Sequence, residues 1–397
     1  MERLFEGFLT KLKGVESYFI RYLNAQIDWT DRLIGIKGGR GTGKTTLLLQ
    51  HIQIHIKPGV EVLYVSLDEL YFTSHTLTDL ADDFVKAGGR HLFLDEVHKY
   101  PGWSREIKNL YDTYKDLQIV FTGSSMLEIS KGDADLSRRA VVYELTGLSF
   151  REFLLIEKRL TFPVVKWQDI LVDHVDMAQD ISKKLKPLPS FKDYLKFGYY
   201  PYFQENKKNY HQRLAATINL VIESDLPAIE HVDYSTIQKL KKLLYILSTS
   251  VPFKPNIQKL SEQIHATRGS TLLYLDYLKN AQLLSLLRGE TEGNSYMNKP
   301  DKIYLNNTNL LYALAPENAN VGTLRETFFY NQLQSTSSIT SSEKANFTIN
   351  KKMTFEIGGK NKPTDQVKGL SNMYIAADEI EIGLRNKIPL WLFGFLY

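Results

Sequence analysis

The sequence predicts an α/β fold built around a parallel sheet, and two observations support this prediction. Between about residues 30 and 147, short β-rich runs alternate with segments that repeat apolar residues at helical spacing, which is typical of a parallel sheet with crossover helices. Residues 38–45 read Gly-Gly-Arg-Gly-Thr-Gly-Lys-Thr and match the phosphate-binding pattern G-x-x-x-x-G-K-S/T. The apolar run 33–36 and the helical run 46–50 supply the strand and the helix that this pattern requires.

Five strands and two helices are predicted in this first part of the chain. In order, the strands are Leu33–Ile36, Glu61–Ser66, His91–Asp95, Gln118–Thr122 and Ala140–Glu144. The helices Leu77–Lys86 and Trp103–Tyr114 lie between them, each with apolar residues on one face. From Leu148 to about Leu226 the pattern becomes helical and aromatic, with breaks at Pro163 and at residues 186–190, and we expect a helical lid there.

The second half of the chain predicts two further units. Three amphipathic segments are followed by two strand-like segments, which is the plan of a winged helix. The helical segments are Ile237–Leu247, Ile257–Ile264 and Thr271–Lys279, and the strand-like segments are Leu283–Leu287 and Lys302–Leu305. We expect a tight turn over 267–270, before the third helix. After a polar stretch at 335–342, a last α/β unit begins and ends on the apolar tail 389–396. The predicted domains are therefore a sheet core (1–147), a helical lid (148–234), a winged helix (235–315) and an α/β unit (316–397).

The amino-acid composition indicates a folded globular protein and excludes several kinds of site. The chain has 397 residues, of which 43% are apolar and 24% charged, a balance typical of folded globular domains. No apolar run approaches the roughly 18 residues that a membrane helix needs, and the first residues do not form a secretory signal, so we expect a cytoplasmic protein without a membrane partner. The absence of cysteine excludes disulfides, thiolate metal sites and cysteine nucleophiles.

The glycine-rich loop predicts a nucleoside triphosphate site. Glycines let the backbone fold around a phosphate with its N–H groups pointing inward. Lys44 would reach the β- and γ-phosphates, and the Thr45 hydroxyl would bind Mg²⁺. We therefore expect ATP and Mg²⁺ as cofactors, with the nucleotide bound by Gly38, Gly39, Arg40, Gly41, Thr42, Gly43, Lys44, Thr45 and Thr46.

Two carboxylates follow a buried strand downstream of this loop. The strand 91–95 ends in Asp95, and Glu96 comes directly after it. Because the carboxyl ends of parallel strands meet at one edge of a sheet, both side chains should lie beside the nucleotide. We expect Asp95 to hold Mg²⁺ through water and Glu96 to polarise the water that attacks the γ-phosphate. These residues predict an ATPase.

The strand that begins at Gln118 also ends in small polar side chains. A hydroxyl at that position can contact the γ-phosphate or the attacking water, and so sense whether the phosphate is present. Ser124 is the first candidate for this role, and Thr122 and Ser125 are the alternatives.

Two adjacent arginines, Arg138 and Arg139, precede the last strand of the core. A planar and permanently charged guanidinium suits a transferring phosphoryl group, and an arginine finger speeds hydrolysis by about 10³–10⁵-fold. Either residue can be the finger. An exposed basic pair without a catalytic role is the alternative interpretation.

Taken together, these motifs resemble a known family. Residues 38–46, 92–96, 122–125 and 138–145, with the heptapeptide at 148–154, are similar to AAA-type ATPases of bacteria and archaea. In that family this core precedes a winged helix and a nuclease-like C-terminal domain of unknown function. The resemblance covers nearly the whole chain, and residues 148–154 mark this branch of the phosphate-loop proteins. It implies a sheet of the AAA type, a helical lid and finger arginines that reach a neighbouring subunit of a homo-oligomer.

The predicted winged helix is locally basic. Between Ser235 and Glu290 there are eight Lys or Arg and three Asp or Glu, a net charge of +5, whereas the whole chain carries +4. In the third helix we expect Leu272, Leu275 and Leu278 to face the core. The side chains expected to face outward are Arg268, Ser270, Thr271, Tyr274 and Lys279. Such a surface suits the phosphates of duplex DNA, and contact with another protein is the alternative.

The last unit resembles the restriction-endonuclease-like fold. The metal site of that fold uses an acid on one strand and Glu-x-Lys on the next. Here Asn346 stands in place of the first acid, and Gly358 stands where a lysine should follow Glu356. Residues that could replace the missing groups in space are Lys360, Lys362 and Asp365. We expect a structural remnant without nuclease activity.

The leading functional prediction is therefore a DNA-associated ATPase that acts as a nucleotide-dependent switch. One alternative is a signalling or assembly ATPase that contacts only proteins. The other is an ATP-dependent nuclease.

Overall fold

The computed structural model describes residues 1–397 except 57–58, 125–135, 137, 231, 251–253, 290–298 and 364–371. The chain divides into two compact units. The first unit consists of Met1–Thr146 together with residues 224–231, and the second consists of Gly147–Glu223 and all residues from Val232 to the end. The first unit therefore takes up a short segment from far along the chain.

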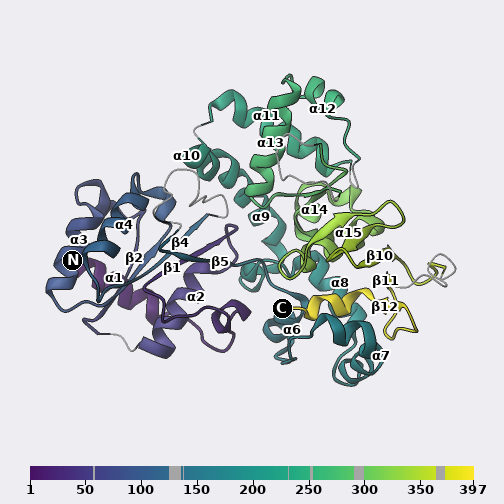
Figure 1. Cartoon of the computed structure of the whole chain (residues 1–397), viewed down its shortest axis with the longest axis horizontal. Helices are drawn as coiled ribbons and strands as arrows, with labels where there is room; N and C mark the ends of the chain where they lie inside the picture. The colour runs from purple at the N-terminus through teal and green to yellow at the C-terminus, as the bar shows by residue number, and fades with distance from the viewer. Residues whose placement is uncertain are drawn as a thin grey trace. The chain divides into compact units, whose positions relative to one another are not determined.

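A five-stranded parallel sheet forms the centre of the first unit (Figure 1). In the order β2-β3-β4-β1-β5, its strands are β2 (Val62–Ser66), β3 (His91–Asp95), β4 (Gln118–Ser124), β1 (Leu33–Gly38) and β5 (Val141–Glu144). All adjacent pairs are parallel, and the register sets Gly38 opposite Ser124 and Ser66 opposite Asp95. The predicted α/β class with a parallel sheet is confirmed, and the carboxyl ends of β1, β3 and β4 meet at one edge.

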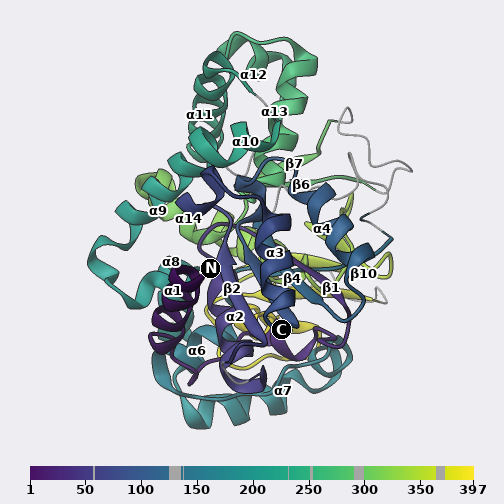
Figure 2. The same cartoon turned by 90° about the vertical axis from the view of Figure 1, so that its left-hand side faces the viewer.

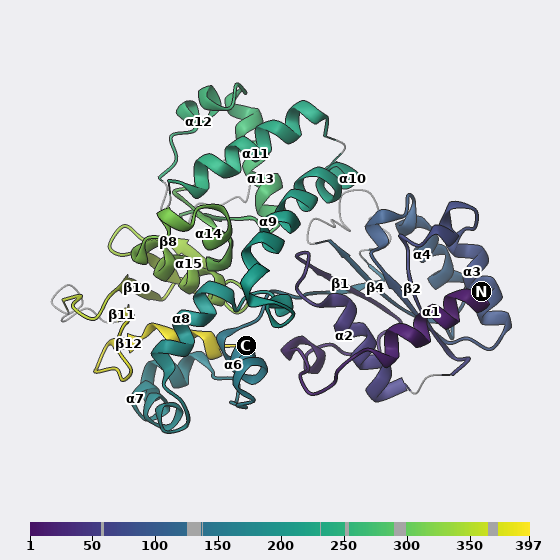
Figure 3. The same ribbon diagram turned by 180° about the vertical axis from the view of Figure 1, so that it is seen from behind.

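Helices cover both faces of this sheet (Figure 2). Helices α3 (Leu77–Lys86) and α4 (Trp103–Thr113) enclose one apolar core with the sheet, and α2 (Lys44–His51) encloses the other. Helix α1 (Glu2–Lys13) runs along β2 and contributes to both cores (Figure 3). Short helical turns connect these elements: η1 (Tyr22–Ala25), η2 (Ile52–Ile56), η3 (Leu70–Thr73) and η4 (Val97–Lys99).

The second unit begins with helices α6 (Phe150–Lys158), α7 (Trp167–Lys184), α8 (Pro187–Phe197) and α9 (Tyr210–Leu220). The predicted break at 186–190 is wrong in part, because Pro187 opens α8 at a position where a helix tolerates proline. After α9 come the π-helix η7 (Val221–Asp225) and the short α10 (Leu226–Glu230).

Three helices and a two-stranded sheet follow. They are α11 (Tyr234–Ser248), α12 (Ile257–Gln263), α13 (Arg268–Asn280) and the antiparallel pair β6 (Leu284–Leu287) and β7 (Lys302–Leu305). The predicted turn over 267–270 is wrong, because Thr267 caps α13 by accepting a hydrogen bond from the Ser270 N–H, and the helix begins at Arg268.

The chain ends in helices α14 (Thr308–Leu314) and α15 (Val321–Leu333) and a second sheet. The order of this sheet is β12-β11-β10-β9-β8, with β8 (Ile339–Ser341), β9 (Phe347–Ile349), β10 (Met353–Gly358), β11 (Met373–Ala377) and β12 (Lys387–Pro389). The pairs β10–β11 and β11–β12 are parallel, and the other two are antiparallel.

The polar stretch 335–342 includes β8, a half-buried edge strand of this sheet. The apolar tail forms the buried 3₁₀ helix η10 (Leu390–Phe395). The subdivision of the second unit at residues 234 and 315 stays a prediction. Within the described parts of the chain, no helix combines the length and the apolar character that crossing a membrane requires.

Candidate functional site

The phosphate loop connects β1 to α2, and its backbone geometry requires glycine. Gly41 (φ 80°) and Gly43 (φ 95°) adopt left-handed conformations that side chains disfavour. A Cβ atom at Gly38 would lie 2.4 Å from the carbonyl oxygen of Leu145, which follows β5. Three of the loop's glycines are therefore explained by local structure.

Hydrogen bonds fix the loop from both sides. The Thr42 hydroxyl donates to the Gly39 carbonyl at 2.8 Å, and the buried Arg21 guanidinium donates to the Thr42 carbonyl. Lys44 is buried, and its ammonium donates to the carbonyls of Gly38 (2.9 Å) and Gly39 (3.1 Å). Burial lowers the pKa of Lys44, against the opposing charges of nearby carboxylates. The Lys44 ammonium is thus held inside the loop by backbone carbonyls, at the place where the same loop would bind a phosphate.

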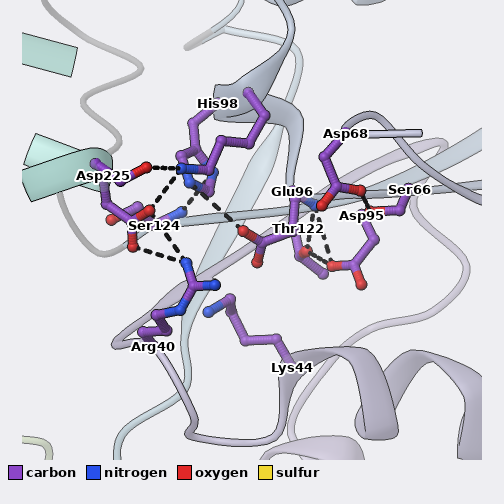
Figure 4. A network of polar contacts seen from close by, with 12 residues as sticks. Arg40, Lys44, Ser66, Asp68, Asp95, Glu96, His98, Thr122, Ser124 and Asp225 are labelled. Atoms are coloured by element: carbon purple, nitrogen blue, oxygen red, sulfur yellow. Dashed lines mark hydrogen bonds and ion pairs between the residues drawn. The ribbon is translucent and has the colours of Figure 1, made fainter. Parts of the chain in front are cut away.

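Asp95 is the centre of a hydrogen-bond cluster at the end of β3 (Figure 4). The hydroxyls of Thr45 and Tyr64 donate to one carboxylate oxygen of Asp95, at 2.6 and 2.7 Å, and the Thr122 hydroxyl donates to the other. The side chains of Thr45 and Asp95, predicted separately as magnesium ligands, are therefore in direct contact. Sequence reasoning missed Tyr64, which lies inside an apolar strand without any motif.

Glu96 follows Asp95 in a strained conformation. Its φ of 53° is uncommon for a residue with a side chain, and such strain concentrates at functional sites. The Glu96 N–H donates to the Asp95 carboxylate at 3.1 Å. Burial raises the pKa of Glu96, although the Lys44 ammonium opposes this shift. The two adjacent carboxylates thus point in different directions from the end of one strand.

His98 lies behind the Glu96 carboxylate and was not predicted. Its Nδ1 accepts a hydrogen bond from the Ser124 N–H at 3.3 Å, so Nε2 carries the ring proton in the neutral form. That Nε2 lies 3.5 Å from Glu96 Oε2. Burial lowers the pKa of His98 to about 4, so the ring is uncharged near neutral pH and the contact is not an ion pair. His98 therefore lies close to Glu96 without contributing charge, and among the described residues its buried Nε2 has no hydrogen-bond partner.

The three candidate hydroxyls at the end of β4 occupy different environments. Thr122 is fully buried, and its hydroxyl both donates to Asp95 and accepts from the Glu96 N–H at 3.3 Å. Its role is therefore to fix the two acids. Ser124 is the last residue of β4, opposite Gly38 at the start of the phosphate loop, so its role as a sensor stays a prediction. Ser125 lies outside the described residues.

The two candidate finger arginines also differ. Arg139 Nε and Nη2 donate to both carboxylate oxygens of Asp112 on α4, at 2.9 and 3.0 Å. Arg138 is exposed to solvent. The ion pair holds Arg139 against its own unit, whereas nothing comparable is found for Arg138 among the described residues.

A cavity of about 530 Å³ opens beside Asp95 and Glu96. Its lining includes Thr45, Asp95 and Glu96, but also Thr10 and Lys11 of the N-terminal helix α1. Sequence reasoning missed α1 because its contribution depends on packing along β2.

Asp225 is the most distant residue of the site in the sequence (Figure 4). Its side chain is 4% exposed, and it forms ion pairs with Arg40 of the phosphate loop (3.1 Å) and with Lys99 of η4 (2.6 Å). It follows no recognisable motif, so only the fold could reveal it.

In the predicted winged helix, the core side of α13 is as expected, since Leu272, Leu275 and Leu278 are buried. The expectation for Thr271 and Tyr274 is wrong, because both are buried. The Thr271 hydroxyl lies 2.8 Å from Ser261 Oγ of α12, so a polar side chain satisfied inside the bundle was interpreted as exposed. The exposed cations of α13 are Arg268 and Lys279.

In the last unit, Lys362 contacts Glu356, and whether it stands in for the lysine of a nuclease site stays a prediction. Its ammonium donates to Glu356 Oε1 at 2.5 Å, and a Cβ at Gly358 would lie within 2.8 Å of the Lys362 side chain. Asn346 donates to Glu326 Oε1 at 2.9 Å, while its own oxygen accepts from the Ile357 N–H at 2.8 Å. Asp365 lies outside the described residues. Among those residues, no group of three His, Asp or Glu is arranged to hold a metal ion.

Two protein-family models match the chain. Residues 30–154 match the model described as an AAA domain, and residues 188–321 match a domain of unknown function, DUF8612. The first match includes β1 to β5 and the hydrogen-bond cluster around Asp95, but neither α1 nor Asp225. Residues 30–154, which contain the phosphate loop, are therefore similar to AAA domains.

Two uncharacterized proteins of Methanocaldococcus jannaschii are similar in sequence. They are 29% identical over 266 residues and 26% identical over 267 residues. Each alignment covers 64% of this chain but only 56% and 55% of the relatives, so the chain spans about half the length of the curated relatives that it matches.

Two solved structures are also similar to this chain. The Orc1 protein of Aeropyrum pernix in complex with DNA is 12% identical, over 79% of this chain and 92% of that one, with a TM-score of 0.31. AMPPCP-bound DnaA from Aquifex aeolicus is 17% identical, over 64% and 84%, with a TM-score of 0.27. These TM-scores are too low to indicate a shared overall architecture.

Proposed function

We propose that the first unit binds ATP with Mg²⁺ and hydrolyses it. The observation that supports this most strongly is the convergence of Thr45 with the adjacent acids Asp95 and Glu96, from two separate parts of the sequence, around one cavity beside the phosphate loop. Lys44 would bind the β- and γ-phosphates, and Glu96 would polarise the attacking water. Catalysis of this kind depends on positioning and charge stabilisation, for which acids held by hydrogen bonds beside a cavity are suited.

The donor set at the end of β3 fits a magnesium ion. Mg²⁺ binds hard oxygen ligands, keeps several waters and in nucleotide sites uses one or two protein groups. The Thr45 hydroxyl and the Asp95 carboxylate, 2.6 Å apart, are such groups. We propose that Thr45 binds the ion directly and that Asp95 holds it through water. The bound ion would supply charge neutralisation at the phosphates.

The direct test is ATP hydrolysis by the purified chain, measured with and without duplex DNA over a range of protein concentrations. We expect hydrolysis that requires Mg²⁺ and stops when EDTA removes it. Calorimetry that detects no ATP binding by a folded chain would refute the proposal.

We further propose that this ATPase is associated with DNA in the cytoplasm, through residues 235–305 acting as a winged helix. The support is the arrangement of α11, α12, α13, β6 and β7, together with the exposed cations Arg268 and Lys279 at the two ends of α13. A protein-only assembly ATPase is the alternative, and DNA binding separates the two.

We expect the double variant Arg268→Ala/Lys279→Ala to bind duplex DNA more weakly than the native chain. If both side chains contact phosphates, the slope of log affinity against log salt should fall by about two units in magnitude, since each contact contributes about 0.9. Fluorescence anisotropy at several salt concentrations measures this slope. The matched control is Lys192→Ala/Lys208→Ala, which removes two exposed lysines elsewhere. Equal slopes in all three proteins would favour the protein-only alternative.

The nuclease alternative is disfavoured, and we expect the chain not to cleave nucleic acid. Cleavage needs a divalent ion held by several free oxygens. Here Lys362 neutralises Glu356, and Glu326 accepts hydrogen bonds from Asn346 (2.9 Å) and Tyr304 (2.6 Å). The assay incubates single- and double-stranded DNA and RNA with the native chain in Mg²⁺ or Mn²⁺, beside Glu356→Ala. Cleavage that is lost in this variant would make the nuclease the leading function.

A further inference from the structure

Asp225 is a buried acid that forms ion pairs with two cations of the candidate site, Arg40 and Lys99, and we call these two ion pairs the bridge. Arg40 Nη1 lies 3.1 Å from both Asp225 oxygens, and Lys99 Nζ lies 2.6 Å from Oδ1 and 3.3 Å from Ser224 Oγ. Burial alone would raise the pKa of Asp225, but the hydrogen bond from Lys99 and the charge of Arg40 outweigh it, and the pKa is lowered. The acid is therefore ionised in the folded protein, and it forms an ion pair with each of the two cations.

Both cations belong to the region where the phosphates of a nucleotide would be bound. Arg40 is part of the phosphate loop, and Lys99 lies in η4, directly after Glu96 and His98. The charge of Asp225 also reaches further, since it contributes to the pKa shifts of both Lys44 and Glu96. A carboxylate and a γ-phosphate would therefore occupy neighbouring positions and attract the same cations.

The segment that carries Asp225 is also connected to the second unit through the chain on either side of it. Asp225 is the last residue of the π-helix η7, and π-helices are rare and often lie at functional sites. Residues 224–231 belong to the first unit, whereas the chain on both sides of them belongs to the second. Asp225 and the fully buried Leu226 hold this inserted segment in place. Asp225 therefore lies in a segment that is connected at both ends to the second unit.

We propose that Asp225 competes with the γ-phosphate of bound ATP for Arg40 and Lys99, so that ATP binding releases residues 224–230 from the rest of the first unit. This inference depends on the proposed function, since it requires ATP at the phosphate loop. Breaking a buried ion pair is costly when a charge is left unpaired, and the phosphate avoids that cost by replacing the carboxylate. ADP lacks the γ-phosphate and leaves the bridge closed. The position of the segment, which is connected at both ends to the second unit, would thereby depend on whether ATP or ADP is bound.

The first measurement uses the native chain, with hydrogen exchange of residues 224–230 followed by mass spectrometry. We expect faster amide exchange with the non-hydrolysable analogue AMP-PNP and Mg²⁺ than with ADP or without nucleotide. Unchanged or slower exchange with saturating AMP-PNP would overturn the inference while the proposed ATP binding stands. A native chain that binds neither nucleotide would refute the proposed function, and the inference with it.

The second measurement is the affinity of Asp225→Asn for AMP-PNP and ADP by calorimetry. A bridge that is closed in about nine of ten native molecules weakens apparent affinity about tenfold, so its removal should strengthen AMP-PNP binding by that factor and leave ADP binding nearly unchanged. The control Glu223→Gln removes an exposed charge from the same π-helix, where it pairs with Lys241, and should bind like the native chain. Weaker AMP-PNP binding by Asp225→Asn would contradict the inference. If this variant fails to fold, the exchange comparison on the native chain decides alone.

Discussion

Replacing Lys44 by alanine is expected to abolish tight ATP binding, whereas Glu96→Gln should bind ATP and fail to turn it over. Lys44 is the one buried ammonium in the phosphate loop, and its hydrogen bonds to the Gly38 and Gly39 carbonyls show that it reaches the inside of the loop. Charge-assisted hydrogen bonds contribute about 1.5–3 kcal/mol each, so two of them to phosphate oxygens correspond to an affinity loss of about 100-fold or more.

Glu96→Gln keeps the size of the side chain and leaves Lys44, Thr45 and the loop unchanged. It removes only the carboxylate that would polarise water, and loss of such a base lowers kcat by about 10²–10⁴-fold. Calorimetry measures the two affinities, and phosphate release measures turnover. Glu61→Gln, an exposed position on the same unit, is the matched control and should behave as the native chain. An equal loss of ATP binding in both site variants would contradict the assigned roles.

The sequence was informative where local rules determine structure. The helix Leu77–Lys86 was predicted residue for residue from the regular spacing of its apolar residues. The structure shows in addition that Thr76 and Asp79 form a capping box at its start. The phosphate loop and the acids Asp95 and Glu96 follow a motif whose spacing reflects the order of strands in a parallel sheet. Their convergence could therefore be expected before any coordinates.

Other parts of the site depend on contacts between distant segments, for which a single sequence carries no signal. Tyr64 and His98 reach Asp95 and Glu96 only because β2 and η4 pack beside β3. Asp225 enters the first unit through a detour of the chain that no periodicity reveals. The same reason explains why Thr271 was placed on the wrong side of α13, since its partner Ser261 lies on another helix.

The second large effect on ATP hydrolysis is expected from the pair Arg138 and Arg139, and we predict that Arg138 is the finger. A finger in trans must extend from the surface of one subunit into the site of the next. Arg138 is exposed, whereas Arg139 forms a double hydrogen bond with Asp112 of its own unit. We expect Arg138→Ala to reduce kcat by about 10³-fold or more with little change in ATP affinity, as for other arginine fingers. Asp112→Asn, which releases Arg139 without removing it, should retain most of the activity.

Mixing inactive variants tests whether Arg138 acts on a neighbouring subunit. Arg138→Ala retains an intact ATP site but lacks the finger, and Lys44→Ala retains the finger but cannot bind ATP tightly. At a mixed interface, the Lys44→Ala subunit would supply Arg138 to the nucleotide held by its neighbour, so the mixture should hydrolyse ATP faster than the sum of its components. For the same reason, the specific activity of the native chain should rise with protein concentration as subunits associate. If ultracentrifugation shows a monomer and its specific activity stays constant on dilution, hydrolysis does not need a second subunit and Arg138 has no role in trans.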